Sequence, residues 1–225
     1  MRITALDRKA RRQTLDLYID DELALKISRE TCATFGLREG KEISQDEFGA
    51  VREADAKHVA MKSALRLLSY RSRSEREIRD RLSKKGVAAD ALDSTIGRLR
   101  EVGLLNDAEF AQSFAERRDR TSPRGRRLIV AELRSKGVDS RHADEAAATL
   151  DDADAAYRAG LRRARSMFGL SADDFRRRLG SFLVRRGFDF QTASQTVSKL
   201  WIEMHETPPT NSVDRMAHGR STGSM

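Results

Sequence analysis

Apolar residues recur along this chain with two different spacings, and the spacing changes near residue 43. Before that point they alternate with polar residues, which is the pattern of half-buried β-strands. Two alternating runs flank Asp20 and Asp21, and this arrangement predicts a β-hairpin with a two-residue turn. Ile3 and Ala5 would add a third strand. The N-terminal part is therefore expected to be a small β-sheet.

From Ser44 onward apolar residues recur every three or four positions, as they do on the buried face of a helix. This helical pattern is itself repeated three times around Gly86, Gly137 and Gly187, which are 51 and 50 positions apart. In every copy apolar residues stand eight and four positions before the glycine and one, ten and thirteen positions after it. Such aligned columns indicate tandem modules, each built as helix–helix–helix with the glycine turn between the second and third helices. A glycine at that place is interpreted as a helix C-cap with positive φ.

The repeat predicts a mainly α fold of tandem, helix-turn-helix-like three-helix units in an elongated array, preceded by the small N-terminal β-hairpin. Each unit is too short to bury a large core alone, so neighbouring units are expected to support one another. The C-terminal segment is rich in proline, glycine and polar residues and is expected to be disordered. The expected parts are residues 1–43 (hairpin and a short helix around 29–35), 44–105, 106–150 and 151–206 (the three modules) and 207–225 (the tail).

Polar residues that precede the apolar stripes predict where the helices begin. Ser44 with Glu47 and Ser74 with Glu77 have the spacing of a capping box. In the third module one apolar stripe is predicted at Tyr157, Leu161, Ala164 and Phe168. The other predicted caps are Asp90, Asn106, Ser122 (with Pro123 at the first helical position), Asp151 and Ser171.

The net charge of the chain indicates which class of binding partner it favours. The chain has 43 Lys and Arg against 35 Asp and Glu, which gives a formal net charge of +8 and a pI near 10.0. This balance favours a polyanionic partner such as nucleic acid or an assembly that contains it, although a charged surface that only faces water explains it equally well. Cys32 is the single cysteine, which excludes an internal disulfide, and no apolar run approaches the roughly 18 residues of a membrane span. A cytoplasmic protein is therefore expected.

A search for catalytic chemistry finds little. None of the four histidines is paired with Cys, Asp or Glu at metal-ligand spacing, and Cys32 has no local nucleophile context. No phosphate-binding glycine loop of the ATP-binding type occurs. Asp151, Asp152 and Asp154 resemble an acidic metal cluster but are interpreted as the start of the next helix. We therefore expect no catalytic residue, metal or cofactor, and no enzymatic activity.

Arginines are concentrated in the second and third modules, where the dense run from Arg117 to Arg134 spans a predicted loop. Arginine presents two parallel N–H donors to phosphate or carboxylate, so the run is interpreted as a binding face; the alternative is a solvated helix surface. Aromatic residues are scarce and mostly lie on apolar stripes, which disfavours stacking of single-stranded bases. The predicted partner-binding residues are Arg117, Arg118, Arg120, Arg124, Arg126, Arg127, Arg134, Lys136, Arg158, Arg162, Arg165, Arg185 and Arg186.

An ordered set of short segments carries a family resemblance. They are Tyr18–Leu25, Phe35–Gly40, Ala64–Leu68, Ser74–Ile78, Gly103–Asp107 with Phe110 and Phe114, Leu133–Gly137 and Arg185–Phe188. Together, over about residues 1–205, they resemble the RecX family of bacterial recombination regulators. Two features depart from the family pattern: Asp21 stands where the family often has a glycine in the hairpin turn, and the tail beyond residue 206 is additional.

The resemblance implies a protein that binds the RecA recombinase, as filament or monomer, and mostly inhibits its ATPase, strand-exchange and coprotease activities in DNA repair, recombination and the SOS response. It also implies an elongated helical body lodged in the groove of the RecA–DNA filament, with weak DNA contact and a monomeric state as further expectations. The residue patterns alone leave a second hypothesis open, a stand-alone DNA-binding protein that uses its helix-turn-helix-like modules.

Overall fold

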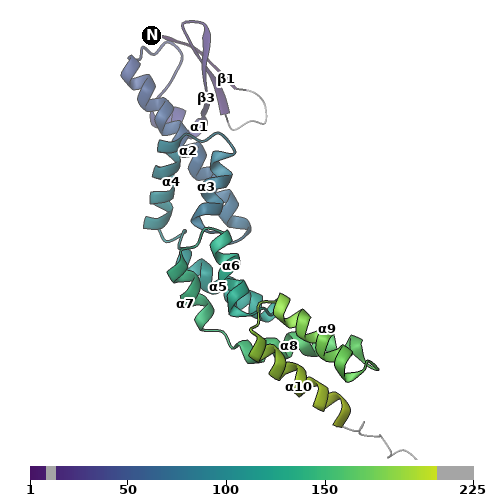
Figure 1. Cartoon of the computed structure of the whole chain (residues 1–225). Coiled ribbons are helices and arrows are strands. Elements are labelled where there is room, and N and C mark those ends of the chain that lie inside the picture. The colour runs from purple at the N-terminus through teal and green to yellow at the C-terminus, as the bar shows by residue number, and fades with distance from the viewer. Residues whose placement is uncertain (9–13, 207–225) are drawn as a thin grey trace, which may run out of the picture. The chain divides into compact units, whose positions relative to one another are not determined.

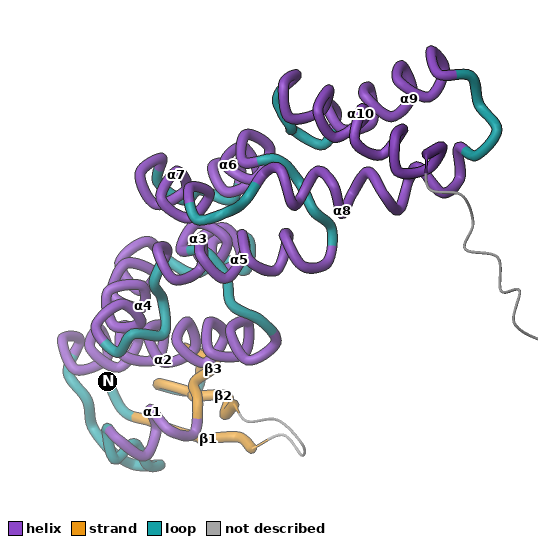
Figure 2. Tube along the Cα trace, turned by 90° about the horizontal axis from the view of Figure 1, so that it is seen from below, coloured by secondary structure: helices purple, strands orange, loops and turns teal. Residues whose placement is uncertain are grey.

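The computed structural model describes residues 1–8 and 14–206, and the predicted tail lies outside these residues. Within them the chain is mainly helical, with one antiparallel sheet near the N-terminus (Figures 1 and 2). The elements are β1 Ile3–Arg8, β2 Thr14–Ile19, β3 Glu22–Ser28, α1 Arg29–Thr34, α2 Gln45–Tyr70, α3 Glu75–Ser83, α4 Ala89–Glu101, α5 Asp107–Thr121, α6 Arg126–Ser135, α7 Ser140–Ala148, α8 Asp152–Ala164, the 3₁₀ turn η1 Arg165–Met167, α9 Ala172–Arg185 and α10 Phe190–Glu206. The mainly α fold with a small N-terminal sheet is confirmed.

The chain forms two compact units. The first unit comprises Met1–Phe114 and Glu132–Ala146, and the second comprises Ala115–Ala131 and the chain from Ala147 onward. The division passes through α5, α6 and α7, so each of these helices contributes residues to both units.

The sheet in the first unit has the order β1-β2-β3, which confirms the third strand. Asp20 and Asp21 have φ of 50° and 68°, the left-handed conformation that both central residues of a tight hairpin turn require. Aspartate tolerates this region better than most side chains. Asp20 also accepts a hydrogen bond from the Arg2 backbone N–H at 2.9 Å, and Thr4 accepts one from the Asp21 N–H at 2.9 Å. These contacts hold the turn against β1.

Helix α2 connects the sheet to the helical repeats (Figure 2). Ser44 and Glu47 form the predicted capping box at its start, with both reciprocal hydrogen bonds present. Near its middle, the buried carboxylate of Asp55 accepts a hydrogen bond from the Ser28 N–H at 2.8 Å. The N-terminal part of α2 packs on the core of the sheet through Val51, and its C-terminal part packs among α3 and α4.

The apolar positions of the repeat are buried, as their spacing predicts, except Val87, which is half-buried. Ile78, Leu82, Ile96 and Leu99 are fully buried in one cluster of the first unit. In the second unit α8, α9 and α10 lie side by side (Figures 1 and 2) and enclose a cluster that contains Phe175, Leu179, Leu183, Phe188, Val197 and Leu200. The predicted stripe on α8 is wrong at Phe168, because the α-helix ends at Ala164 and Met167 is buried instead while Phe168 is 81% exposed.

The three repeat glycines adopt positive φ, with values of 78° at Gly86, 83° at Gly137 and 90° at Gly187, so the C-cap prediction is confirmed. Two of them also approach a neighbouring helix closely. A Cβ atom at Gly137 would overlap the Arg76 side chain, and one at Gly187 would overlap Leu128. At these two positions glycine therefore permits close packing as well as the turn.

Two predicted helix starts are wrong. Asp90 does not cap α4, because the N-cap residue is Ala88, which makes no side-chain hydrogen bond there. Asp90 lies within the first turn of the helix. Ser122 and Pro123 do not start α6, which begins at Arg126. The predicted caps Asn106, Asp151 and Ser171 are confirmed, because each accepts hydrogen bonds from backbone N–H groups two or three residues later. Ser74 accepts a hydrogen bond from the Glu77 N–H, but the Glu77 side chain accepts one from Lys136. Only the Ser74 half of that predicted capping box is therefore present.

One pair of hydrogen bonds recurs where a helix start meets a repeat glycine turn and the first residue of a later helix, and we call this arrangement the junction. In the first unit the Ser74 hydroxyl donates to the Lys136 carbonyl at 2.6 Å, and the Glu75 N–H donates to Asp107 Oδ1 at 2.8 Å. The acceptor for the first backbone N–H of α3 is thus the side chain of Asp107, the first residue of α5. Backbone donors at a helix start have no partner within the helix, so this acceptor satisfies a group that would otherwise be unpaired.

The same junction appears in the second unit. The Gly125 N–H donates to the Arg186 carbonyl at 2.9 Å, and the Arg126 N–H donates to Asp152 Oδ1 at 3.0 Å. Lys136 and Arg186 are equivalent, since each directly precedes a repeat glycine, and Asp107 and Asp152 each open the next helix. Equivalent residues therefore make equivalent contacts in the two units.

Candidate functional site

The structure distributes the predicted binding residues between the two units. Arg134 and Lys136 belong to the first unit, and the other predicted residues belong to the second. Arg134 pairs with Asp144 at 3.4 Å, and Lys136 pairs with Glu77 at 3.0 Å. Burial opposes ionisation of the Glu77 carboxyl, but hydrogen bonds from Arg71 and Lys136 outweigh it and lower the pKa of Glu77 to about 2. In the first unit these basic groups therefore already have acidic partners.

Two of the predicted arginines in the second unit bind neighbouring segments of the protein. Arg126 donates through Nε and Nη2 to the Leu150 carbonyl, at 3.0 and 2.5 Å. Arg158 donates to the Asp119 carbonyl at 2.7 Å and pairs with the carboxylates of Asp119 and Asp154, each at 2.6 Å. Burial lowers the pKa of Arg158, but the two aspartates raise it above its ordinary value overall. Both guanidinium groups hold the fold together.

Four other arginines form what we call the arginine cluster: Arg118, Arg124, Arg162 and Arg186. They come from α5, the loop before α6, α8 and the C-cap of α9. Burial lowers the pKa of Arg124, and the positive charges of Arg118 and Arg186 lower it further. Burial likewise lowers the pKa of Arg186, with a further contribution from Arg162. Segments far apart in the sequence thus bring like charges within electrostatic range in a partly buried setting.

Arg186 is held in place within this cluster. Its Nη1 atom donates to the Pro123 carbonyl at 3.1 Å and approaches the Ser122 hydroxyl at 3.5 Å, and its guanidinium lies 4.8 Å from the centre of the Phe182 ring. These partners are neutral, so they orient the guanidinium without cancelling its charge. An oriented guanidinium that keeps its charge is suited to a bidentate contact with phosphate or carboxylate.

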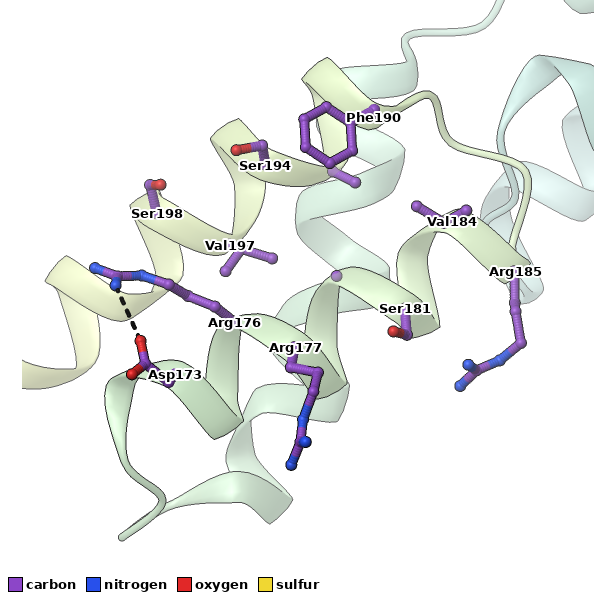
Figure 3. A pocket seen from close by; sticks show the side chains of 12 residues that line it. Asp173, Arg176, Arg177, Ser181, Val184, Arg185, Phe190, Ser194, Val197 and Ser198 are labelled. Atoms are coloured by element: carbon purple, nitrogen blue, oxygen red, sulfur yellow. Dashed lines mark ion pairs between the residues drawn. The ribbon is translucent and has the colours of Figure 1, made fainter.

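Exposed arginines accompany the cluster in the second unit. All are predicted binding residues with exposed side chains: Arg117, Arg120, Arg127, Arg165 and Arg185. Two further arginines of α9, Arg176 and Arg177, were not among the predicted binding residues, and they line a groove beside α10 (Figure 3). No periodicity in the sequence identifies them, because the groove depends on how α9 packs against α10.

Other kinds of site find no support in the described part of the chain. Among residues 1–8 and 14–206, no three His, Cys, Asp or Glu side chains come together as a metal site. The Cys32 thiol is buried and donates to the Leu37 carbonyl at 3.5 Å, and burial raises its pKa, which disfavours the nucleophilic thiolate. In the same residues no helix is both long and apolar enough to cross a membrane.

The fold and the basic surface define a class: a tandem three-helix protein with a small N-terminal sheet and a cluster of arginines in its second unit. Two family models match consecutive stretches of the chain, the first three-helix domain of RecX at residues 60–99 and the second at residues 106–146. The chain belongs to the RecX family of regulatory proteins.

Curated relatives named regulatory protein RecX share low but extended identity with the chain. The protein of Bacillus licheniformis is 29% identical over 195 residues, which cover 85% of this chain and 74% of the relative. That of Bacillus subtilis is 27% identical over 203 residues, covering 88% and 76%. That of Listeria monocytogenes is 31% identical over 139 residues, covering 61% and 52%.

Two solved structures share the fold. A crystal structure of regulatory protein RecX has a TM-score of 0.63 and 22% identity, and the match covers 89% of this chain and 98% of that one. The structure of RecX from Lactobacillus salivarius has a TM-score of 0.60 and 24% identity, covering 66% and 99%.

Proposed function

We propose that this chain binds the RecA recombinase, as filament or monomer, and restrains its ATPase, strand-exchange and coprotease activities. It acts by binding and catalyses no reaction itself. Family membership supports the partner, and the arginine cluster of the second unit is the observation that supports the mode of contact. This function belongs in the bacterial cytoplasm, where recombination takes place.

The arginine cluster supports binding to an anionic surface for an electrostatic reason. Arg124 is repelled by Arg118 and Arg186, and Arg186 is repelled by Arg162. The partial burial of Arg118, Arg124 and Arg186 reduces the screening of these repulsions by water. An anionic group placed among them would relieve this repulsion. A nucleoprotein filament offers carboxylates on protein and phosphates on DNA, and both accept bidentate hydrogen bonds from arginine. Binding is therefore expected to weaken steeply as salt is added.

The remaining arginines have a different role in this proposal. Arg126 and Arg158 hold neighbouring segments and position the cluster. The exposed arginines, such as Arg120 and Arg127, extend the positive surface around it. A contact spread over several modules would gain strength because each bound module raises the effective concentration of the next.

The test is ATP hydrolysis by RecA on single-stranded DNA, measured with and without this protein. The parent should inhibit hydrolysis. A double variant, Arg118→Gln with Arg124→Gln, should require about tenfold more protein for the same inhibition, which corresponds to about 1.4 kcal/mol. The matched control is Arg98→Gln with Arg141→Gln, which removes the same charge from exposed side chains of the first unit. The control should inhibit like the parent.

Three results would contradict the proposal. A parent protein that leaves hydrolysis unchanged and does not bind RecA would remove its central claim. Equal effects of the two double variants would show that net charge matters and the cluster does not. Tight binding to one duplex sequence without RecA, by several kcal/mol over other sequences, would favour the stand-alone DNA-binding hypothesis. Circular dichroism on every variant checks that the helices are intact.

A further inference from the structure

A groove of about 900 Å³ runs between α9 and α10 in the second unit (Figure 3). Its walls carry apolar side chains that stay open to solvent: Phe190 is 82% exposed and Val184 is 49% exposed. Val197 of α10 and Gly180 of α9 also line the groove, and a Cβ atom at Gly180 would meet nothing within 4 Å. An isolated exposed apolar residue is ordinary, but exposed apolar residues gathered in a groove indicate a surface to which a partner binds.

The repeat shows what occupies the same place in the other modules. Seven positions after the repeat glycine stands an aspartate in the first two modules, Asp93 and Asp144. Asp93 pairs with Arg79 at 2.6 Å, which links α4 to α3, and Asp144 pairs with Arg134 at 3.4 Å, which links α7 to α6. In both modules an ion pair therefore bridges the second and third helices on the surface.

The third module has lost both members of this ion pair. Ser194 stands where the aspartates are, and the two positions that supply the arginine, seven and three before the glycine, are Gly180 and Val184. Three positions after the glycine, Ala89 of the first module and Ser140 of the second become Phe190. These changes act together, because each removes charge or adds apolar surface on one face of α9 and α10. They convert a bridged surface into an open apolar groove.

The rim of this groove is positively charged. Three of its lining residues are arginines, Arg176, Arg177 and Arg185, and one is an aspartate, Asp173. Arg176 pairs with Asp173 at 3.7 Å, an ion pair with both side chains well exposed (Figure 3). Arg177 pairs with Asp174 at the start of α9. Arg185 has no carboxylate partner among the described residues, so the rim keeps a net positive charge.

We propose that the α9–α10 groove binds an acidic amphipathic helix of a partner protein. The apolar face of that helix would cover Phe190 and Val184, and its carboxylates would meet Arg176, Arg177 and Arg185. A helix laid into a groove between two helices is a common mode of peptide recognition, with apolar anchors one turn apart. Nucleic acid fits less well, since its phosphates would leave Phe190 and Val184 uncovered and would face Asp173.

The chain's own C-terminal segment lacks the chemistry of this occupant. Residues 207–225 contain one aspartate and two arginines, so their charge does not complement the rim. The proposal also does not rest on RecA binding, because it follows from the comparison of the three modules alone. Its test therefore uses the full-length protein without RecA.

The experiment measures fluorescence anisotropy of a labelled helical peptide with Trp and Leu one turn apart on one face and glutamates on both flanks. A second peptide carries lysines in place of the glutamates. Two variants close the groove. Val184→Arg with Ser194→Asp rebuilds the ion pair of the second module, and Phe190→Ser introduces the residue found at Ser140. The control is Phe168→Ser, which removes an equally exposed phenylalanine, 81% against 82%, from a site outside the groove.

The parent and Phe168→Ser should bind the acidic peptide alike and at least about tenfold more tightly than the lysine peptide. Both groove variants should lose about tenfold or more of the affinity for the acidic peptide while keeping the parent's circular dichroism. The proposal is overturned if the parent does not prefer the acidic peptide, or if Phe190→Ser binds it as well as the parent does. It is also overturned if ultracentrifugation shows a dimer that both groove variants abolish, because the occupant is then a second copy.

Discussion

The carboxylate of Asp107 caps the helix that begins at Glu75, 32 residues earlier in the chain, through a hydrogen bond of 2.8 Å from the Glu75 N–H. Asp152 does the same for the helix that begins at Arg126, at 3.0 Å. Burial raises the pKa of both aspartates despite the backbone bond that each accepts. Each junction therefore uses a partly desolvated carboxylate as an acceptor, and the first residue of one helix determines how well a preceding helix starts.

Two substitutions of Asp107 should show whether its hydrogen-bond acceptor or its negative charge stabilises the fold. Asp107→Ala leaves the Glu75 N–H without a partner and should lower the free energy of unfolding by about 1 kcal/mol, as for other lost helix caps. Asp107→Asn keeps an acceptor oxygen and removes a charge whose burial is unfavourable, so its unfolding free energy should stay within about 0.5 kcal/mol of the parent. Urea denaturation followed by circular dichroism measures both. Equal losses in the two variants would contradict the capping role.

The repeat glycines should differ in their tolerance of a side chain. Gly86→Ala adds only the strain of positive φ, about 1–2 kcal/mol, because nothing lies within 4 Å of the new Cβ. Gly137→Ala carries the same strain and also pushes the Cβ into Arg76, so it should destabilise the protein more. The comparison is made by urea denaturation at neutral pH. If Gly86→Ala proved the more harmful variant, the close approach at Gly137 would have no energetic role.

Acid should weaken the first unit through Glu77. Its pKa is about 2 in the folded protein against 4.5 without such contacts, so the folded state binds fewer protons and is favoured above pH 4.5. This contribution, on the order of 2–3 kcal/mol, should be lost as the pH falls from 4.5 towards 2. Glu77→Gln should therefore be less stable than the parent at pH 7, and the difference should shrink below pH 4.5 and nearly vanish only near pH 2.

The control for this acid titration is Glu101→Gln, which removes an exposed ion pair with Arg98 and should change stability little at either pH. Chemical denaturation at a series of pH values gives the unfolding free energies. A stability difference between parent and Glu77→Gln that does not change with pH would show that charge pairing at Glu77 does not stabilise the fold.

Two arginines on one face of α8 should separate stability from binding. Arg158→Ala breaks contacts to the carbonyl and carboxylate of Asp119, both partly buried, and should cost about 1–3 kcal/mol of unfolding free energy. Arg162→Ala removes an exposed side chain of the arginine cluster and should leave thermal stability nearly unchanged. Under the proposed function it should still weaken inhibition of RecA. A stable Arg158→Ala protein would contradict the structural role assigned to that guanidinium.

The sequence by itself determined the secondary structure and the buried faces. The alternation around Leu17 and Ile27 and the helical spacing of Ile78 and Leu82 reflect a local rule, because each side chain's direction follows from the backbone period. Gly86 at the end of α3 follows from the same local geometry, since the chain must adopt positive φ there. Predictions that depended only on neighbours in sequence were mostly confirmed.

Tertiary structure decided the junctions, the arginine cluster and the groove. Ser122 was expected to cap a helix, yet α6 starts at Arg126 because Asp152, from another helix, supplies the acceptor. Nothing local distinguishes Arg158, which is tied to Asp119, from Arg162, which is exposed. Whether a charge is cancelled, buried or free to bind depends on which segments pack beside it, and that information lies in contacts between residues far apart in the chain.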